Sequence, residues 1–139
     1  MVGAALAPKH IDNVGMRGKN LLIREYNTIT PENIMKWGEI NPEPEVFNWT
    51  EPDLFVQFGE DNDMFMVGHA LVWHSQLSDY VKEITNPGLM REALKAHINA
   101  VAGRYKGRID AWDVVNEALN EDGTMRESVF YQVLGEDYM

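Results

Sequence analysis

The chain has 139 residues, of which 45% are hydrophobic and 24% charged, as is typical of a single soluble globular domain. Its formal net charge of −10 argues against nucleic acid or an anionic membrane as a partner and suits a neutral substrate. The sequence contains no cysteine, which excludes a disulfide framework and a thiolate metal site.

No targeting signal is evident in the sequence. The longest apolar run, residues 64–73, is too short to span a bilayer and contains Gly68 and His69. The N-terminus lacks the basic region and long apolar stretch of a signal peptide. We therefore expect no membrane partner, and the localisation stays unknown: either the chain is cytoplasmic or its start has been removed.

The first quarter of the chain predicts two strands, each followed by a helix. Small apolar residues at 2–6 predict an opening strand, and the spacing of the next apolar residues predicts a helix from Pro8 to about Glu25. A β-prone run that ends at Thr30 predicts the second strand. Behind it we expect a short helix with Thr30 as its N-cap and Pro31 at its first position.

The middle of the chain predicts a loop, a helix and a buried strand. Residues 41–45 form a proline-rich loop, and Thr50 opens a capping-box sequence whose helix runs to about residue 61. A buried strand is predicted at 64–67. Polar and aromatic side chains follow directly beyond that strand: His69, Trp73, His74 and Gln76.

The last part of the chain contains the clearest helical pattern. This helix begins at Asn86, ends at Gly107 and carries an apolar stripe of Met90, Leu94, Ile98, Val101 and Tyr105. A strand follows from Ile109, and residues 126–134 predict the start of another helix. Because strands alternate with helices throughout, we predict an α/β fold built of parallel βαβ units.

Residues 111–117 form a mostly apolar strand that ends in Asn116 and Glu117. Such strands are typically buried on both faces, and burial raises the pKa of a carboxyl at their end, which suits a general acid. In the alternative interpretation, Asn116 caps a helix that starts at Ala118, and Glu117 lies in its first turn. This stretch alone leaves both interpretations open.

Polar side chains follow three of the predicted strands, at or just beyond the point where each ends. In parallel α/β folds these ends meet at one edge of the sheet, which carries the active site. The sequence therefore predicts one site built from three strands: Glu32, Asn33 and Lys36; His69, Trp73 and Gln76; and Asn116 and Glu117.

Four stretches of the sequence resemble the family-10 glycoside hydrolases, which are (β/α)8-barrel endo-β-1,4-xylanases. The stretches are TPENIMKW at 30–37, GHALVWHSQ at 68–76, RYKG at 104–107 and WDVVNE at 112–117. The order and spacing of these stretches along the chain also match the family. The resemblance implies a (β/α)8 TIM barrel of which residues 1–139 form the N-terminal half, with about the first four βα units.

The resemblance also implies a role for each predicted site residue. Glu117 would be the general acid/base, and Asn116 would hydrogen-bond the 2-hydroxyl of the sugar beside the scissile bond. The subsites on the non-reducing side would be lined by Glu32, Asn33, Lys36, His69 and Trp73, with Gln76 close by. The implied reaction is retaining hydrolysis of internal β-1,4-xylosidic bonds in xylan, without a cofactor. The nucleophile would come from the second half of the barrel, and no residue here matches its motif.

Several of these residues also have a simpler interpretation. Lys36 could be a solvated lysine, Glu32 a first-turn residue stabilised by a helix dipole, and the other tryptophans core or wall residues. His69 and His74 lie five residues apart, which is not a zinc-motif spacing, so we expect no metal. We expect His10 and His97 to be incidental. Asn48 begins a glycosylation sequon, which is common by chance.

The sequence departs from the family pattern at three positions near these motifs. Tyr80 stands where tryptophan is usual, Ser78 where proline is common, and Glu45 at a position usually held by glycine. We expect none of the three to touch the chemistry.

The length leaves alternatives open, because a closed barrel takes about 250 residues. The chain could be a fragment, pair with a C-terminal half-barrel chain, or self-associate. One alternative function is an inactive half-barrel with residual xylo-oligosaccharide binding, and another is a related barrel β-glycanase such as a cellulase or β-galactosidase. The GHALVWHSQ stretch argues against the latter.

Overall fold

The structure is a computed structural model that describes residues 1–12 and 16–139. Its elements follow the chain as β1 (Gly3–Leu6), α1 (Lys9–Asp12), α2 (Met16–Glu25), β2 (Thr28–Pro31), α3 (Trp37–Ile40), α4 (Thr50–Asp61), β3 (Phe65–Trp73), α5 (Asp79–Lys82), α6 (Pro87–Arg104), β4 (Ala111–Asn116), α7 (Val129–Leu134) and the 3₁₀ helix η1 (Gly135–Tyr138).

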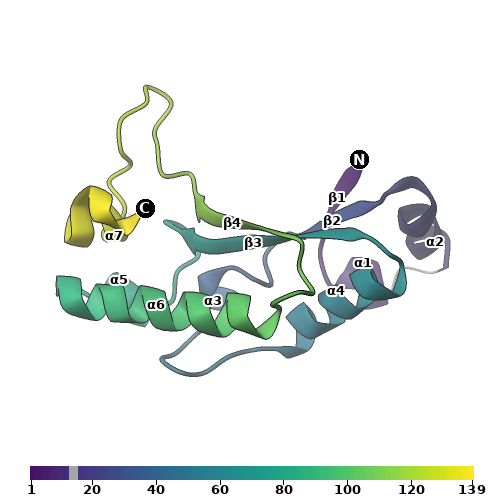
Figure 1. Cartoon of the computed structure of the whole chain (residues 1–139), viewed down its shortest axis with the longest axis horizontal. Helices are drawn as coiled ribbons and strands as arrows, with labels where there is room; N and C mark the ends of the chain where they lie inside the picture. The colour runs from purple at the N-terminus through teal and green to yellow at the C-terminus, as the bar shows by residue number, and fades with distance from the viewer. Residues whose placement is uncertain (13–15) are drawn as a thin grey trace.

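The strands form one sheet in the order β1-β2-β3-β4, with every neighbouring pair parallel. The two long helices, α4 and α6, lie along the same face of this sheet (Figure 1). Within the described residues the sheet stays open, with β1 and β4 at its edges. This confirms the predicted parallel α/β fold of about four βα units.

The core lies between the sheet and the two long helices. The apolar stripe of α6 places Met90, Leu94 and Val101 in this core, as its spacing predicts. Ile98 is only partly buried, whereas His97, which we expected to be incidental, is fully enclosed. A helix turns through 100° per residue, so His97 also lies one turn from Leu94 and Val101 and shares their face.

Two predicted helix starts differ from the structure. Pro31 is not a first helical residue but the end of β2, paired with Leu6, and helix α3 begins only at Trp37. Proline disfavours the helical conformation in the residue before it, which keeps Thr30 extended. Thr50 lies inside α4, and no side-chain cap bond is made at the start of that helix.

Two further predicted boundaries are also displaced. The single helix expected from Pro8 to Glu25 is seen as α1 and α2, and the part of that prediction at residues 13–15 lies outside the described residues. The final helix begins at Val129 instead of residue 126, because the Ser128 side chain accepts a hydrogen bond from the Tyr131 N–H and caps it there.

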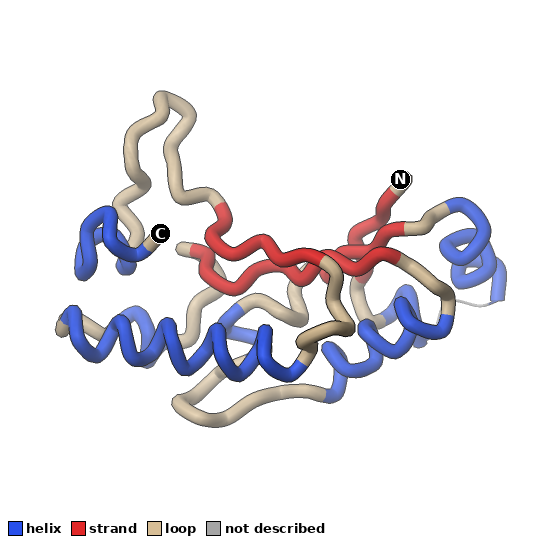
Figure 2. Tube along the Cα trace, viewed as in Figure 1, coloured by secondary structure: helices blue, strands red, loops and turns tan. Residues whose placement is uncertain are grey.

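Strand β4 is less buried than its sequence suggests. We expected it to be covered on both faces, but Asp113 and Val114 are exposed, the latter by 51%. The cause is its place at the edge of the described sheet, where only β3 pairs with it. Figure 2 shows the loop that follows β4 projecting away from the sheet before the chain returns to α7.

No helix among the described residues combines the length and apolar character needed to cross a membrane.

Candidate active site

The predicted site residues meet at the carboxyl ends of β2, β3 and β4. Strand pairing places His69 beside Asp113 and Trp73 beside Asn116. His69 and Trp73 lie within β3 itself, since this strand runs six residues beyond its predicted end at residue 67. The residues of β2 follow its last position, Pro31, in the turn before α3.

Four residues from the ends of β2 and β3 form what we call the Lys36 cluster: Asn33, Lys36, Trp73 and Gln76. Lys36 is only 8% exposed. Its Nζ donates to Asn33 Oδ1 at 2.8 Å and lies 4.4 Å from the centroid of the Trp73 ring. Gln76 Nε2 lies 3.4 Å from the same Asn33 oxygen. The solvated-lysine interpretation is therefore wrong.

Glu32 lies beside this cluster, at the solvent-exposed end of β2. Its backbone N–H donates to the Leu6 carbonyl at 2.9 Å, which continues the pairing of β1 and β2 by one residue. No helix begins at Glu32, so the interpretation of its carboxylate as a partner of a helix dipole is also wrong.

His69 is oriented by a carboxylate from the neighbouring strand. Its Nδ1 lies 2.8 Å from Asp113 Oδ2, and its ring is tilted against Trp73 with the centroids 6.3 Å apart. We expected the strand at 111–117 to be buried on both faces, but the Asp113 side chain is half exposed. A carboxylate at Nδ1 fixes the orientation of the imidazole and leaves Nε2 for another partner.

The end of β4 presents Asn116 and Glu117. Asn116 is the last residue of the strand, and Glu117 adopts a left-handed backbone conformation with φ of 53°. Residues 117–128 form a loop with an isolated bridge between Leu119 and Met125, so the interpretation of Asn116 as a helix cap is wrong. The expected burial of the Glu117 carboxyl is not found either, since the side chain is 48% exposed.

Two residues that the motifs did not single out for a role lie against Glu117. His74 Nε2 is 3.8 Å from Glu117 Oε2. Burial lowers the pKa of His74, the Arg126 charge lowers it further, and the Glu117 carboxylate opposes both. Arg126 donates from Nε to the Glu117 carbonyl at 2.9 Å and so holds the strained residue in place. His74 lies within the GHALVWHSQ motif, whereas no sequence signal marks Arg126.

A narrow cleft with no room for a water molecule lies at the ends of β3 and β4, and Trp73, His74, Asn116 and Glu117 line it. Trp73 Nε1 and His74 Nδ1 are buried there and have no hydrogen-bond partner among the described residues. In the part of the chain that the structure describes, no group of three histidine, aspartate or glutamate side chains is placed to hold a metal ion.

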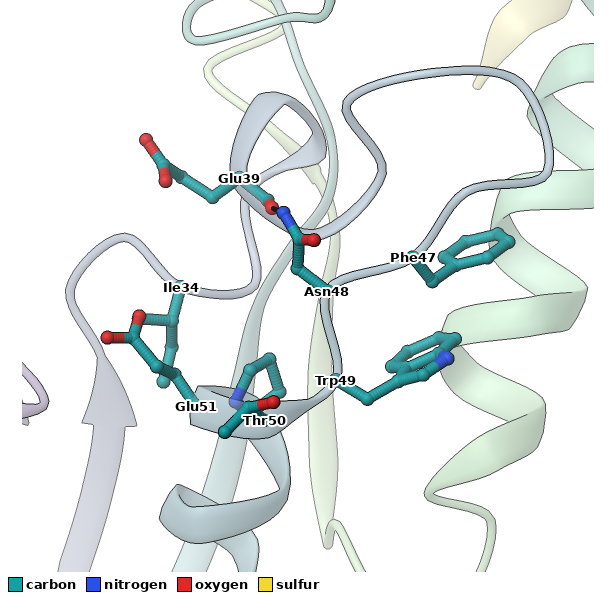
Figure 3. A pocket seen from close by; sticks show the side chains of 8 residues that line it. Ile34, Glu39, Phe47, Asn48, Trp49, Thr50 and Glu51 are labelled. Atoms are coloured by element: carbon teal, nitrogen blue, oxygen red, sulfur yellow. Dashed lines mark hydrogen bonds between the residues drawn. The ribbon is translucent and has the colours of Figure 1, made fainter.

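A pocket of about 380 Å³ lies away from this edge, at the start of α4 (Figure 3). Trp49 forms part of its wall and stacks on Phe47 with the ring centroids 4.8 Å apart, as expected for a wall residue. Asn48, the residue of the glycosylation sequon, is exposed and donates from Nδ2 to the Glu39 carbonyl at 2.8 Å.

The sequence matches the family described as glycosyl hydrolase family 10 over residues 1–139. It is 45% identical over 125 residues to endo-1,4-beta-xylanase 3 of Hypocrea jecorina, covering 88% of this chain and 36% of that protein. It is 53% identical over 116 residues to endo-1,4-beta-xylanase A of Humicola insolens, covering 83% of this chain and 31% of the relative. The chain thus spans about a third of the length of these relatives.

Solved structures agree with this match. A GH10 endoxylanase from a sugarcane soil metagenome superposes with a TM-score of 0.91 at 42% identity, covering 98% of this chain and 41% of that one. Xylanase 10B from Thermotoga petrophila RKU-1, in complex with xylobiose, gives a TM-score of 0.90 at 38% identity, covering 98% and 42%.

Proposed function

The chain belongs to glycosyl hydrolase family 10, and on this premise we propose that it supplies the acid/base half of an active site that hydrolyses internal β-1,4-xylosidic bonds in xylan. In this proposal, residues 1–139 correspond to the N-terminal half of the catalytic barrel. The observation that carries it is the meeting of the Lys36 cluster with Asn116 and Glu117 at the carboxyl edge of one parallel sheet.

Glu117 acts as general acid and then as general base. It protonates the leaving glycosidic oxygen in the first step and deprotonates the attacking water in the second. Its carboxyl at the end of β4 is half exposed and can therefore reach a bound chain. Asn116 binds the 2-hydroxyl of the reacting sugar, a contact that strengthens as positive charge develops on the ring.

The Lys36 cluster, with Glu32 and His69, binds the sugars on the non-reducing side. A neutral polyhydroxylated ligand requires amide, ammonium and carboxylate partners beside an aromatic surface, and these residues provide all of them. Lys36 is held by Asn33 and Trp73, so its position is set before the ligand arrives. Holding polar groups in place in this way reduces the entropy cost of binding.

Retention of configuration requires a second carboxylate about 5 to 5.5 Å from the acid/base, which attacks the anomeric carbon. Asp113 does not suit this role, because its carboxylate is engaged by His69. We propose that the nucleophile belongs to the C-terminal half of the barrel, supplied in the same protein or by a second chain.

Turnover tests the catalytic part of the proposal. The purified chain is assayed on xylan alone and together with the C-terminal half of a family-10 xylanase, with the mass in solution recorded. We expect new reducing ends to form only in the mixture, and this activity to be lost in Glu117→Gln. The matched control is Glu121→Gln, an exposed carboxylate in the same loop. If Glu117→Gln lost as much activity on an activated aryl xyloside as on xylan, that result would contradict an acid role for Glu117.

A second candidate is a non-catalytic half-barrel that binds xylo-oligosaccharides. The observation favouring it is that the Lys36 cluster is fully assembled within this chain. Titration of the chain with xylotriose and with cellotriose separates the outcomes. Binding of xylotriose without turnover in any mixture supports the second candidate, and preference for cellotriose supports a related β-glycanase.

A further inference from the structure

A buried polar network lies directly behind the Lys36 cluster, and Asn41 is at its centre. This side chain is almost fully buried, yet each of its polar atoms has partners. Nδ2 donates to the carbonyls of Glu43 and Val46 at 2.7 and 2.9 Å. Oδ1 accepts from the Tyr80 hydroxyl at 2.8 Å and lies 3.2 Å from His97 Nδ1. A fully satisfied buried amide of this kind fixes the segments around it.

Two further contacts join Asn41 to α3 and to the segment after β3. The Tyr80 hydroxyl accepts from Trp37 Nε1 at 2.8 Å while it donates to Asn41. The Ser78 hydroxyl donates to the Asn41 carbonyl at 2.6 Å. One buried asparagine therefore links α3, the loop at 43–46, the segment around Ser78 and helix α6.

The segment that carries Ser78 also carries Gln76 of the Lys36 cluster. Gln76 has a left-handed backbone with φ of 48°, a conformation that is unfavourable for a residue with a side chain. The Gln76 carbonyl accepts from the Gly38 N–H at 2.8 Å. A Cβ atom at Gly38 would lie 2.6 Å from that carbonyl oxygen, so only glycine permits this approach. Gln76 is thus fixed by Gly38 on one side and by Ser78 on the other.

We propose that Asn41 is a positioning residue for the sugar subsites, which it controls through Ser78 and Gln76. The strained backbone of Gln76 persists because Gly38 and the Asn41 network hold both of its sides. Its amide is thereby aimed at Asn33, which in turn orients Lys36. The identity of the bound sugar rests on the proposed function, whereas the backbone positioning does not.

Two of the three departures from the family pattern, Ser78 and Tyr80, lie in this network. Proline at position 78 would lack the hydroxyl that binds the Asn41 carbonyl. Tryptophan at position 80 could donate to Asn41 but could not accept from Trp37 Nε1, because an indole N–H is a donor only. Ser78 and Tyr80 are therefore the residues through which this chain makes the network, and neither is expected to touch the chemistry itself.

Amide hydrogen exchange of the Gly38 N–H tests the positioning directly. Ser78→Ala removes one hydroxyl, and we expect Gly38 to exchange about fivefold faster relative to the core amides of β3. The matched control is Ser128→Ala, which removes the hydroxyl of another buried serine that caps α7, and should leave Gly38 unchanged. Tyr80→Phe keeps the ring and provides a second test if Ser78→Ala does not fold.

Ser78→Pro provides a matched backbone variant. Ser78 has φ of −64°, the value that proline imposes, so this change removes the hydroxyl without forcing a new conformation at that residue. We expect the same faster exchange at Gly38 as in Ser78→Ala. Unchanged Gly38 exchange in Ser78→Ala, Ser78→Pro and Tyr80→Phe would overturn the proposal.

A xylotriose titration, followed by the side-chain amide signals of Asn33 and Gln76, tests the consequence for binding. We expect the dissociation constant to rise about fivefold in Ser78→Ala and to stay unchanged in Ser128→Ala. Full affinity in Ser78→Ala, despite fast exchange at Gly38, would overturn the link to the subsites while the proposed function stands. If the parent chain itself does not bind, the binding function fails and Gly38 exchange alone decides on the positioning.

Discussion

The two halves of the candidate site are built to different degrees of rigidity. The Lys36 cluster lies over a buried network, and its lysine, at 8% exposure, is held by an amide and an indole ring. Glu117, on the other side of the cleft, is 48% exposed and its backbone is held chiefly by one arginine. Lys36, proposed to bind sugar, is thus fixed in advance, whereas the group proposed to move protons has room to rotate.

The difference follows from where each half lies in the sheet. The ends of β2 and β3 have a strand on either side and α3 packed against β3, which covers Lys36 and Val72, although Asn33 and Gln76 remain exposed. β4 has one neighbouring strand among the described residues. Burial on all sides is what fixes a side chain in one rotamer, and a sheet edge provides it on one side only.

The largest expected contrast concerns one histidine from each half. His97 is 1% exposed, and burial lowers its pKa to about 3 from 6.5, with the Leu71 carbonyl offsetting only part of this effect. Between those pH values the unfolded chain binds a proton that the native state does not. The free energy of unfolding therefore falls as the pH falls from 6.5 to 3, by up to about 1.4 kcal/mol per pH unit.

Urea unfolding of the parent, His97→Gln and His74→Gln chains at pH 4 to 7 measures this contrast. His97→Gln should flatten the pH dependence more than His74→Gln, because the pKa of His74 is also lowered but its side chain is partly exposed. If the free energy of unfolding depended on pH equally in the two variants, the two halves would not differ in burial as described.

A pair of valines gives the next largest contrast. Val72 in β3 is 2% exposed and Val114 in β4 is 51% exposed. Truncation of Val72 to alanine should cost about 2 kcal/mol of unfolding free energy, because it removes buried methyl groups and leaves a cavity. Val114→Ala should cost less than about 0.5 kcal/mol. Chemical denaturation of both variants compares them, and a similar cost for each would show that β4 is covered in solution.

The smallest expected effect concerns Arg126, which donates to the carbonyls of Glu117 and Leu119 at 2.9 and 3.3 Å. Arg126→Ala should loosen the loop at 117–128 by about 1 kcal/mol, seen as faster amide exchange there, with little change in global stability. The pKa of His74 should rise, because Arg126 lowers it in the parent chain. Arg91→Ala, which removes an exposed arginine paired with Asp137, is the control.

The fold could be predicted from sequence because its signal is repeated along the chain. Each strand is followed by a helix, and the apolar stripe of α6 correctly places Met90, Leu94 and Val101 in the core. Helix starts were less predictable, since they depend on local competition. Pro31 ends a strand although proline is also common at the first position of a helix.

The site residues could be named from motifs, but their environments could not. The burial of Lys36 depends on Trp73, and the orientation of His69 depends on Asp113 across a strand pair. Neither partnership leaves a trace in local spacing. The exposure of Glu117 was mispredicted for the same reason. An apolar strand has the same sequence pattern whether it lies at the centre or at the edge of a sheet.

The order of the strands across the sheet is also the order in which a ribosome makes them. Each new strand after β1 therefore meets an edge formed by its predecessor and can pair at once. Such a sheet can form one strand at a time during synthesis, and α4 and α6 cover it as β3 and β4 are added. The end of β4 would then be the growing point of the sheet, and the Glu117 carboxyl, which we propose as the acid/base, would be the last of these groups to be put in place.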